Sequence, residues 1–170
     1  MKQFLALLGL LVGVMFLAYW SSKPGNLEAF FARTGLPTAN TPTLTQKTLT
    51  VGSSQFKVEV AQTEQARKTG LSGRESLPED SGMLFVLEKK DEQPAFWMKG
   101  MKFPIDIIWI NDNVVSEITS NVPTIPDNTP DPQIPKYAPR AKVDYVLEIP
   151  AGVANKRGIK VGDTITLPQL

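Results

Sequence analysis

The feature that most constrains this chain is an uninterrupted apolar segment near its N-terminus. Residues Phe4–Trp20 read FLALLGLLVGVMFLAYW, without a charged residue or a proline. A helix of this length spans roughly 25 Å, which is close to the thickness of a hydrocarbon core of about 30 Å. Lys2 and Lys23 flank the segment, and their long side chains can reach the polar interface on either side. We therefore predict an N-terminal transmembrane helix.

A cleaved signal peptide and a buried core helix are the alternatives to this anchor. Signal cleavage requires small residues at the cut site, whereas bulky Tyr19 and Trp20 stand beside Ala18. A retained anchor is therefore favoured, in a single-pass protein of the cell membrane whose C-terminal domain is extracytoplasmic. Gly9 and Gly13 form a G-x-x-x-G pattern that would support a weak homodimer, although glycine is common in membrane helices generally.

Histidine and cysteine are both absent from the 170 residues. Their absence excludes disulfides, thiolate nucleophiles, histidine general bases and the imidazole and thiolate ligands of most transition-metal sites. Asp127, Asn128 and Asp131 offer hard oxygens, but their spacing is not that of a calcium-binding loop. We expect no metal and no cofactor. The net charge of +1 gives no reason to expect a nucleic acid partner.

Composition along the chain predicts three parts. Residues 1–23 form the anchor, and residues 24–46 form a juxtamembrane segment with a flexible tether, GLPTANTPTLTQ, that is rich in proline and threonine. The third part, residues 47–170, carries alternating strand and turn signals and forms the folded domain. Residues 122–139 contain six prolines and are predicted to be a long extended surface loop.

The domain is predicted to be α+β, a compact and strongly curved barrel-like sheet with two short helices, preceded by the transmembrane helix. Thr63 can cap a short helix that ends at Gly70, and a second short helix precedes Gly158. The predicted strands are 47–51, 56–61, 83–87, 95–99, 105–110, 114–120, 143–149 and 164–167, and the predicted helices are 64–69 and 151–157.

Three sequence blocks resemble the DUF192 family, also labelled UPF0127. They are FKVEVAQT with GLSGRESLPEDSGMLFVL, then FWMKGMKFPIDIIWI, and finally YVLEIPAGVANKRGI with VGD. Two positions depart from the family pattern: Ser72 stands where methionine is usual, and Gly100 where asparagine usually follows the W-M-K triplet. The resemblance implies an α+β fold with a barrel-like sheet and, in many members, an N-terminal membrane or export segment. It implies no chemistry.

Four residues are the candidate ligand-binding set, while catalytic residues remain unknown. Trp97, Lys99 and Asp106 lie around the turn at residues 100–104, where an aromatic platform, a cation and an anion could meet a polar ligand. Arg74 adds a planar five-donor group on a nearby loop. Each also has a structural reading, with Trp97 in the core, Lys99 and Asp106 paired locally, and Arg74 stapling its loop to Asp106 or Glu148.

Two further carboxylates, Asp144 and Glu148, are four residues apart on one predicted strand and so share a face. They could act as a catalytic pair, but solvent exposure explains Asp144 more simply, and Glu148 stays open because it lies in the L-E-x-x-x-G block. We predict a binding or accessory module for a small polar ligand or an envelope partner. A carboxylate-dependent hydrolase or lyase and a purely structural interaction module are the alternatives.

Overall fold

The computed structural model describes residues 46–89 and 91–169. The predicted anchor, residues 4–20, the G-x-x-x-G pattern and the tether up to residue 45 lie outside these ranges, whereas Gln46, predicted as the last tether residue, already begins the first strand. Within the ranges, no helix is both long enough and apolar enough to span a bilayer.

Seven strands form one sheet in the order β6-β5-β8-β3-β2-β1-β9. All neighbours are antiparallel except β2 and β3, which are parallel and are joined through helix α3. The strands are β1 (Gln46–Val51), β2 (Ser54–Ala61), β3 (Ser81–Val86), β5 (Ile105–Asn111), β6 (Val114–Val122), β8 (Tyr145–Pro150) and β9 (Ile165–Thr166). A separate pair, β4 (Phe96–Trp97) and β7 (Lys136–Tyr137), forms a second small sheet.

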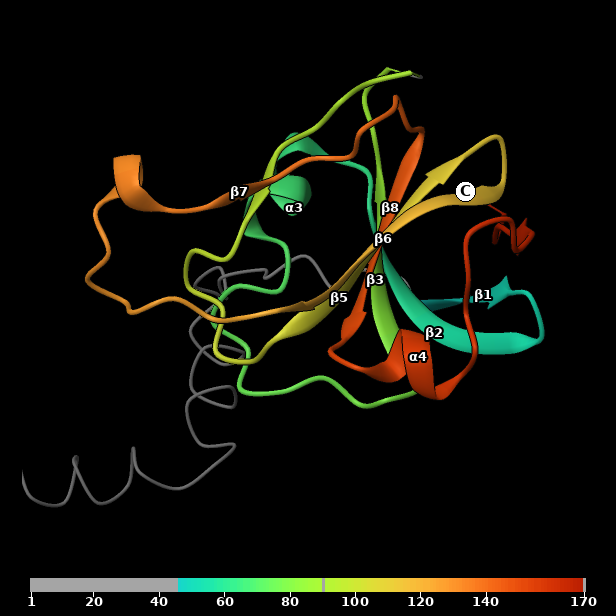
Figure 1. The fold of residues 1–170 in the computed structure, drawn as a ribbon, viewed down its shortest axis with the longest axis horizontal. Coiled ribbons are helices and arrows are strands. Elements are labelled where there is room, and N and C mark those ends of the chain that lie inside the picture. The colour runs from blue at the N-terminus through green and yellow to red at the C-terminus, as the bar shows by residue number, and fades with distance from the viewer. Residues whose placement is uncertain (1–45, 90, 170) are drawn as a thin grey trace, which may run out of the picture. The chain divides into compact units, whose positions relative to one another are not determined.

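The large sheet curls into a half-barrel whose two edges meet at one end. Val114 on β6 forms an antiparallel bridge with Thr164 next to β9. The Val115 amide also donates to the Asp163 carbonyl at 2.9 Å. The twist visible in Figure 1 brings these edge strands together. The predicted α+β class, the curved sheet and the two short helices are thus confirmed.

Both faces of the central strands are buried, which explains the nearly continuous apolar run of β3 and β5. Leu84, Ile108 and Leu147 belong to the cluster on one face, which α4 (Val153–Lys156) covers. Met83 and Trp109 belong to the cluster on the other face, which α3 (Glu64–Thr69) covers. Figure 1 shows the two helices on different sides of the sheet.

Local capping accounts for the limits of α3. The Ala66 amide donates to the Thr63 hydroxyl at 3.1 Å, which satisfies one of the free N–H groups of the first turn. Gly70 ends the helix with a positive φ of 50°, a conformation that glycine adopts without a steric cost. The predicted helix 64–69 and its two caps are therefore confirmed.

The proline-rich segment is more structured than the sequence indicates. It holds a 3-10 helix, Asp131–Gln133, and strand β7, although it was expected to contain no strand. Strand β7 has only two residues, flanked by Pro135 on one side and Pro139 two positions beyond it. Both of its residues therefore keep the N–H group that ladder pairing with β4 requires. The predicted strand 95–99 is correspondingly shortened to Phe96–Trp97.

Candidate functional site

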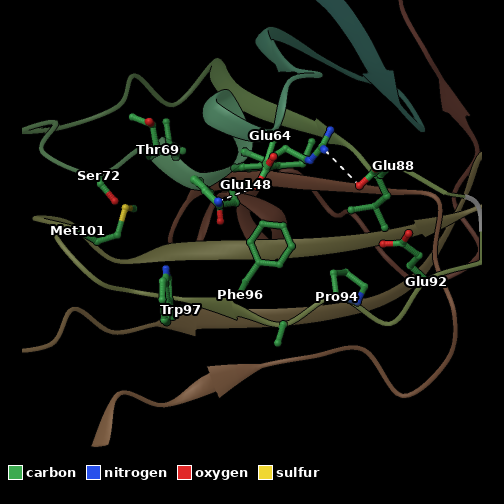
Figure 2. A pocket seen from close by; sticks show the side chains of 17 residues that line it. Glu64, Thr69, Ser72, Glu88, Glu92, Pro94, Phe96, Trp97, Met101 and Glu148 are labelled. Carbon is green, nitrogen blue, oxygen red and sulfur yellow. Dashed lines mark ion pairs between the residues drawn. The ribbon is translucent and has the colours of Figure 1, made fainter. Parts of the chain in front are cut away.

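A cavity of about 660 Å³ opens on the α3 side of the sheet. Helix α3 and the turn that follows it form one wall, and the segment leading into β4 forms the other, with β3 and β8 between them (Figure 2). This volume is typical of sites for small organic molecules. The lining consists of Glu64, Arg67, Lys68, Thr69, Gly70, Leu71, Ser72, Phe85, Leu87, Glu88, Glu92, Pro94, Ala95, Phe96, Trp97, Met101 and Glu148.

Glu148 on β8 is the buried acid of this cavity. Its residue is 6% exposed, and its cross-strand neighbours are the apolar Met83 and Ile107. No described residue donates a hydrogen bond to its carboxyl, and burial raises the pKa of Glu148 to about 8. Among the described residues, Asn111 Oδ1 is the one side-chain oxygen or nitrogen that is both completely enclosed and without a hydrogen-bond partner. The Glu148 oxygens have no partner either, so they cannot be completely enclosed. The Glu148 oxygens therefore retain contact with the open volume of the cavity.

Aromatic rings form much of the apolar wall. Phe96 packs edge-to-face against Phe85, with ring centroids 5.0 Å apart, and against Trp109 at 5.7 Å. These contacts and the pairing of β4 with β7 hold Phe96 in place. The neighbouring Trp97 is 47% exposed and stands at the cavity edge in Figure 2. A ligand would thus meet one rigid ring inside the cavity and one accessible ring at its entrance.

The two cations of the cavity lining are already matched by carboxylates. Lys68 Nζ lies 2.6 Å from Glu64 Oε1, and this bond lowers the pKa of Glu64 below its usual value. Arg67 donates to the carbonyls of Gln62 at 2.6 Å and Val86 at 3.2 Å. Its guanidinium also lies 4.0 Å from Glu88. These groups hold the rim in place rather than balancing Glu148.

Trp97 and Lys99, two of the four predicted site residues, lie together near the cavity. Lys99 Nζ is 5.8 Å from the centroid of the Trp97 ring and 2.5 Å from Asp131 Oδ1. The ion pair ties the 3-10 helix of the proline-rich segment to the end of β4. Of this pair, Trp97 alone lines the cavity among the described residues.

Arg74 is committed to a structural ion pair. Its two terminal nitrogens donate to the two carboxyl oxygens of Glu59 on β2, each at 2.6 Å. The fork geometry of this pair restrains the loop before β3. Arg74 thus staples its loop, as one sequence interpretation held, but the partner is Glu59 rather than Asp106 or Glu148.

Asp106 lies on the opposite face of the sheet from the cavity. It alternates with Ile105 and Ile107, which pack on the cavity side. Its fully buried carboxyl accepts the amide of Asn121 at 2.8 Å and that of Ala154, at the start of α4, at 2.9 Å. The four predicted residues therefore do not converge on one surface.

Asp144 has a structural role at the other end of β8. The expectation that it is solvent-exposed is wrong, because it is 6% exposed and its carboxyl accepts the amides of Asp91 at 3.2 Å and Asp112 at 3.1 Å. These bonds hold two turns against the strand. Glu148, left open by sequence reasoning, is the acid that reaches the cavity. Its sequence signals are its place in the L-E-x-x-x-G block and its position four residues after Asp144 on one predicted strand.

The two residues that depart from the family pattern lie close together, and Ser72 lines the cavity. The Ser72 hydroxyl donates to the Lys99 carbonyl at 2.8 Å, and a Cβ on Gly100 would lie 3.4 Å from Ser72 Cβ. Gly100 has a φ of 71°, which glycine and, less readily, asparagine adopt. An asparagine at position 100 could therefore adopt the same backbone conformation.

Comparisons with known proteins agree with this architecture. The profile of DUF192, described as an uncharacterized ACR, matches residues 47–167. A solved protein of unknown function from Novosphingobium aromaticivorans is 27% identical, with a TM-score of 0.66 over 77% of this chain and 91% of its own. A Sinorhizobium meliloti protein, provisionally described as a transcription regulator, is 25% identical, with a TM-score of 0.63 over 72% and 94%. No curated protein matches.

Proposed function

Because this chain belongs to the DUF192 family, whose description names no activity, we propose its function from the cavity: it is a binding module that holds a small polar ligand against Glu148. Trp97 and Phe96 provide the aromatic surfaces for that ligand. Lys99, Arg74 and Asp106 support the surrounding scaffold through their own pairings.

The unpartnered carboxyl of Glu148 carries this proposal. A buried polar group without a hydrogen bond costs on the order of 1–3 kcal/mol. Structural carboxylates in this domain avoid that cost, as the two amide bonds to Asp106 illustrate. Glu148 is nine-tenths buried, faces a cavity, and receives no such bond from a described residue. A ligand group supplies the missing partner.

An enzymatic role is the second candidate, because burial raises the pKa of Glu148 to about 8. A carboxyl kept protonated near neutral pH is the group that a general acid requires. Glu64 and Glu92 also line the cavity and are the candidates for the second carboxylate of a hydrolase or lyase. Consumption of a bound compound during the experiment below would favour this role over simple binding.

The ligand proposal predicts a thermal shift that depends on Trp97. The full-length chain is screened at pH 7 against sugars, nucleosides, amino acids and amines. A ligand at about a hundred times its Kd stabilises the native state by about 2.7 kcal/mol, or several degrees in Tm. Replacing Trp97 by alanine removes one aromatic surface, and we expect Kd to rise roughly tenfold.

The matched control is Val161→Ala. Val161 is 60% exposed and lies outside the cavity lining, so its loss should leave Kd unchanged. If no compound in the screen raises Tm, or if both variants bind as the wild type does, the cavity is not the binding site that we propose.

The apolar segment adds a location to this proposal. Residues 4–20 form a transmembrane helix that anchors the chain to the cell membrane, with the binding domain on the extracytoplasmic side. The uncharged run FLALLGLLVGVMFLAYW supports the anchor. The Pro- and Thr-rich residues 35–46 support a tether that keeps the domain clear of the surface.

This location predicts the outcome of fractionation and limited proteolysis. After a carbonate wash, the protein should stay in the membrane pellet. A protease added from outside should cut within residues 35–46 and release a fragment of about 13–14 kDa, since exposed tethers are cleaved before folded domains. A soluble mature chain that begins near Ser21 would instead establish a cleaved signal peptide.

A further inference from the structure

Among residues 46–89 and 91–169, the charged groups of the cavity provide no counter-ion for Glu148. The charged groups of the cavity are Glu64, Arg67 and Lys68 on α3, Glu88 after β3, and Glu92 before β4. Both cations are paired, Lys68 with Glu64 and Arg67 with Glu88 and two carbonyls. Glu92 accepts the Lys89 amide at 3.1 Å. The described residues therefore bring more carboxylates than cations to the cavity.

The neighbouring walls are aromatic, which suits a cation in a second way. Phe85, Phe96 and Trp97 line the cavity, and the electron-rich face of such rings attracts an ammonium group. Trp97 already lies within 5.8 Å of the Lys99 ammonium. Lys99 cannot also serve Glu148, since it is bound to Asp131 and lies outside the cavity lining.

We propose that the ligand is a small organic cation, an amine or quaternary ammonium, whose charge lies against the Glu148 carboxylate and whose hydrocarbon part packs against Phe96 and Phe85. This inference rests on the proposed binding function and names the ligand class. A neutral ligand would leave the ionised form of Glu148 uncompensated. An anionic ligand would add to the excess of carboxylates.

Binding of a cation must be coupled to loss of a proton. Below the Glu148 pKa of about 8, the empty cavity holds a neutral carboxylic acid. The cation binds the carboxylate, so the proton leaves the Glu148 oxygen and passes to the buffer. The apparent affinity therefore rises with pH, by about tenfold between pH 7 and 9 and about a hundredfold between pH 6 and 9. Above pH 9 it levels off.

The experiment is calorimetric titration of the full-length chain in lipid nanodiscs. Tetramethylammonium, choline and benzyltrimethylammonium are the probes, because their charge does not change with pH. The neutral carbon isostere of choline and benzyl alcohol are the matched neutral compounds. In buffers of different ionisation enthalpy at pH 7, we expect about 0.9 proton released per cation bound.

Two variants test whether Glu148 is the group that couples cation binding to proton release. Glu148→Gln should abolish both the pH dependence and the proton release, and should weaken cation binding at pH 9 at least tenfold. Glu79→Gln is the control, because Glu79 pairs with Lys156 on α4 and lies outside the cavity lining. It should bind the cation as the wild type does. If Glu148→Gln fails to fold, the wild-type pH profile and proton release still decide the question.

The outcomes separate this inference from the function on which it rests. Cations that bind without pH dependence or proton release, or cations that fail to bind at all, overturn the inference. Neutral compounds that bind more tightly at low pH also overturn it, but they leave the binding function intact with protonated Glu148 as a donor. If no compound of this panel or of the broader screen binds, both the cation inference and the proposed binding function are wrong.

Discussion

Replacing Glu148 by glutamine is expected to stabilise the folded domain at pH 9 and to change its stability little near pH 4.5. Burial raises the pKa of Glu148 from 4.5 to about 8, so the native state holds its proton more tightly than the unfolded state. The free energy of unfolding therefore falls as pH rises from about 4.5 to 8. Glutamine has nearly the same shape as glutamate but cannot ionise. The free energy of unfolding of the variant therefore does not fall with pH for this reason.

The size of the effect follows from the separation of the two pKa values. One pKa unit corresponds to about 1.4 kcal/mol, so the separation between 4.5 and about 8 corresponds to a total loss on the order of 5 kcal/mol, of which about 4 kcal/mol is reached by pH 8. Thermal or urea unfolding between pH 4.5 and 9 measures it, as the difference between Glu148→Gln and wild type. The difference in the free energy of unfolding should approach a plateau near pH 9.

Glu79→Gln is again the control, since Glu79 is exposed and forms a surface pair with Lys156. The free energy of unfolding of Glu79→Gln should differ little from that of the wild type between pH 4.5 and 9. If Glu148→Gln is instead the less stable protein at pH 9, then Glu148 is a stabilised structural carboxylate. The ligand arguments built on it would then lose their basis.

Replacing Asp106 by asparagine is expected to lower the free energy of unfolding by about 2–4 kcal/mol. The two Asp106 oxygens accept amides from two segments, the end of β6 and the start of α4. Asparagine keeps one acceptor and turns an NH₂ group toward the other amide. That amide is then left without an acceptor in a buried site, which costs on the order of 1–3 kcal/mol, and a charged hydrogen bond is lost as well.

Urea unfolding at pH 7 measures this loss, and Asp131→Asn is the matched control. Asp131 forms an exposed pair with Lys99, so its substitution should change stability by less than about 1 kcal/mol. If Asp106→Asn keeps full stability but loses ligand binding, Asp106 belongs to a ligand site, as the sequence predicted. A neutral result in both assays would mean that its two bonds contribute little.

Much of the fold could be predicted because it depends on local rules. The cap at Thr63 and the stop at Gly70 concern residues within a few positions of each other. The continuous apolar run of β3 indicated a strand buried on both faces, as found. Strand β7 was missed because its partner, β4, lies about 40 positions earlier in the chain. Local composition, rich in proline, gave no sign of that pairing.

The candidate site was only partly predictable. Sequence reasoning identified Trp97, which does line the cavity, because an aromatic side chain stands near a cation and an anion around one turn. It also placed Arg74 and Asp106 in the same site. Arg74 instead pairs with Glu59, fifteen positions away, and Asp106 faces the other side of the sheet. Neither partner could be chosen without knowing which strands are neighbours.

By itself, the sequence determined the class of fold, the approximate limits of most elements, the local turns and the exclusion of histidine and cysteine chemistry. These follow from periodicity, capping residues and composition, all of which act over short stretches of chain. Tertiary structure alone decided the burial of Glu148. Alternation shows which residues share one face of a strand, but not what covers that face. Only the packing of α3 and β4 over β8 encloses this carboxyl, and only that enclosure changes its pKa.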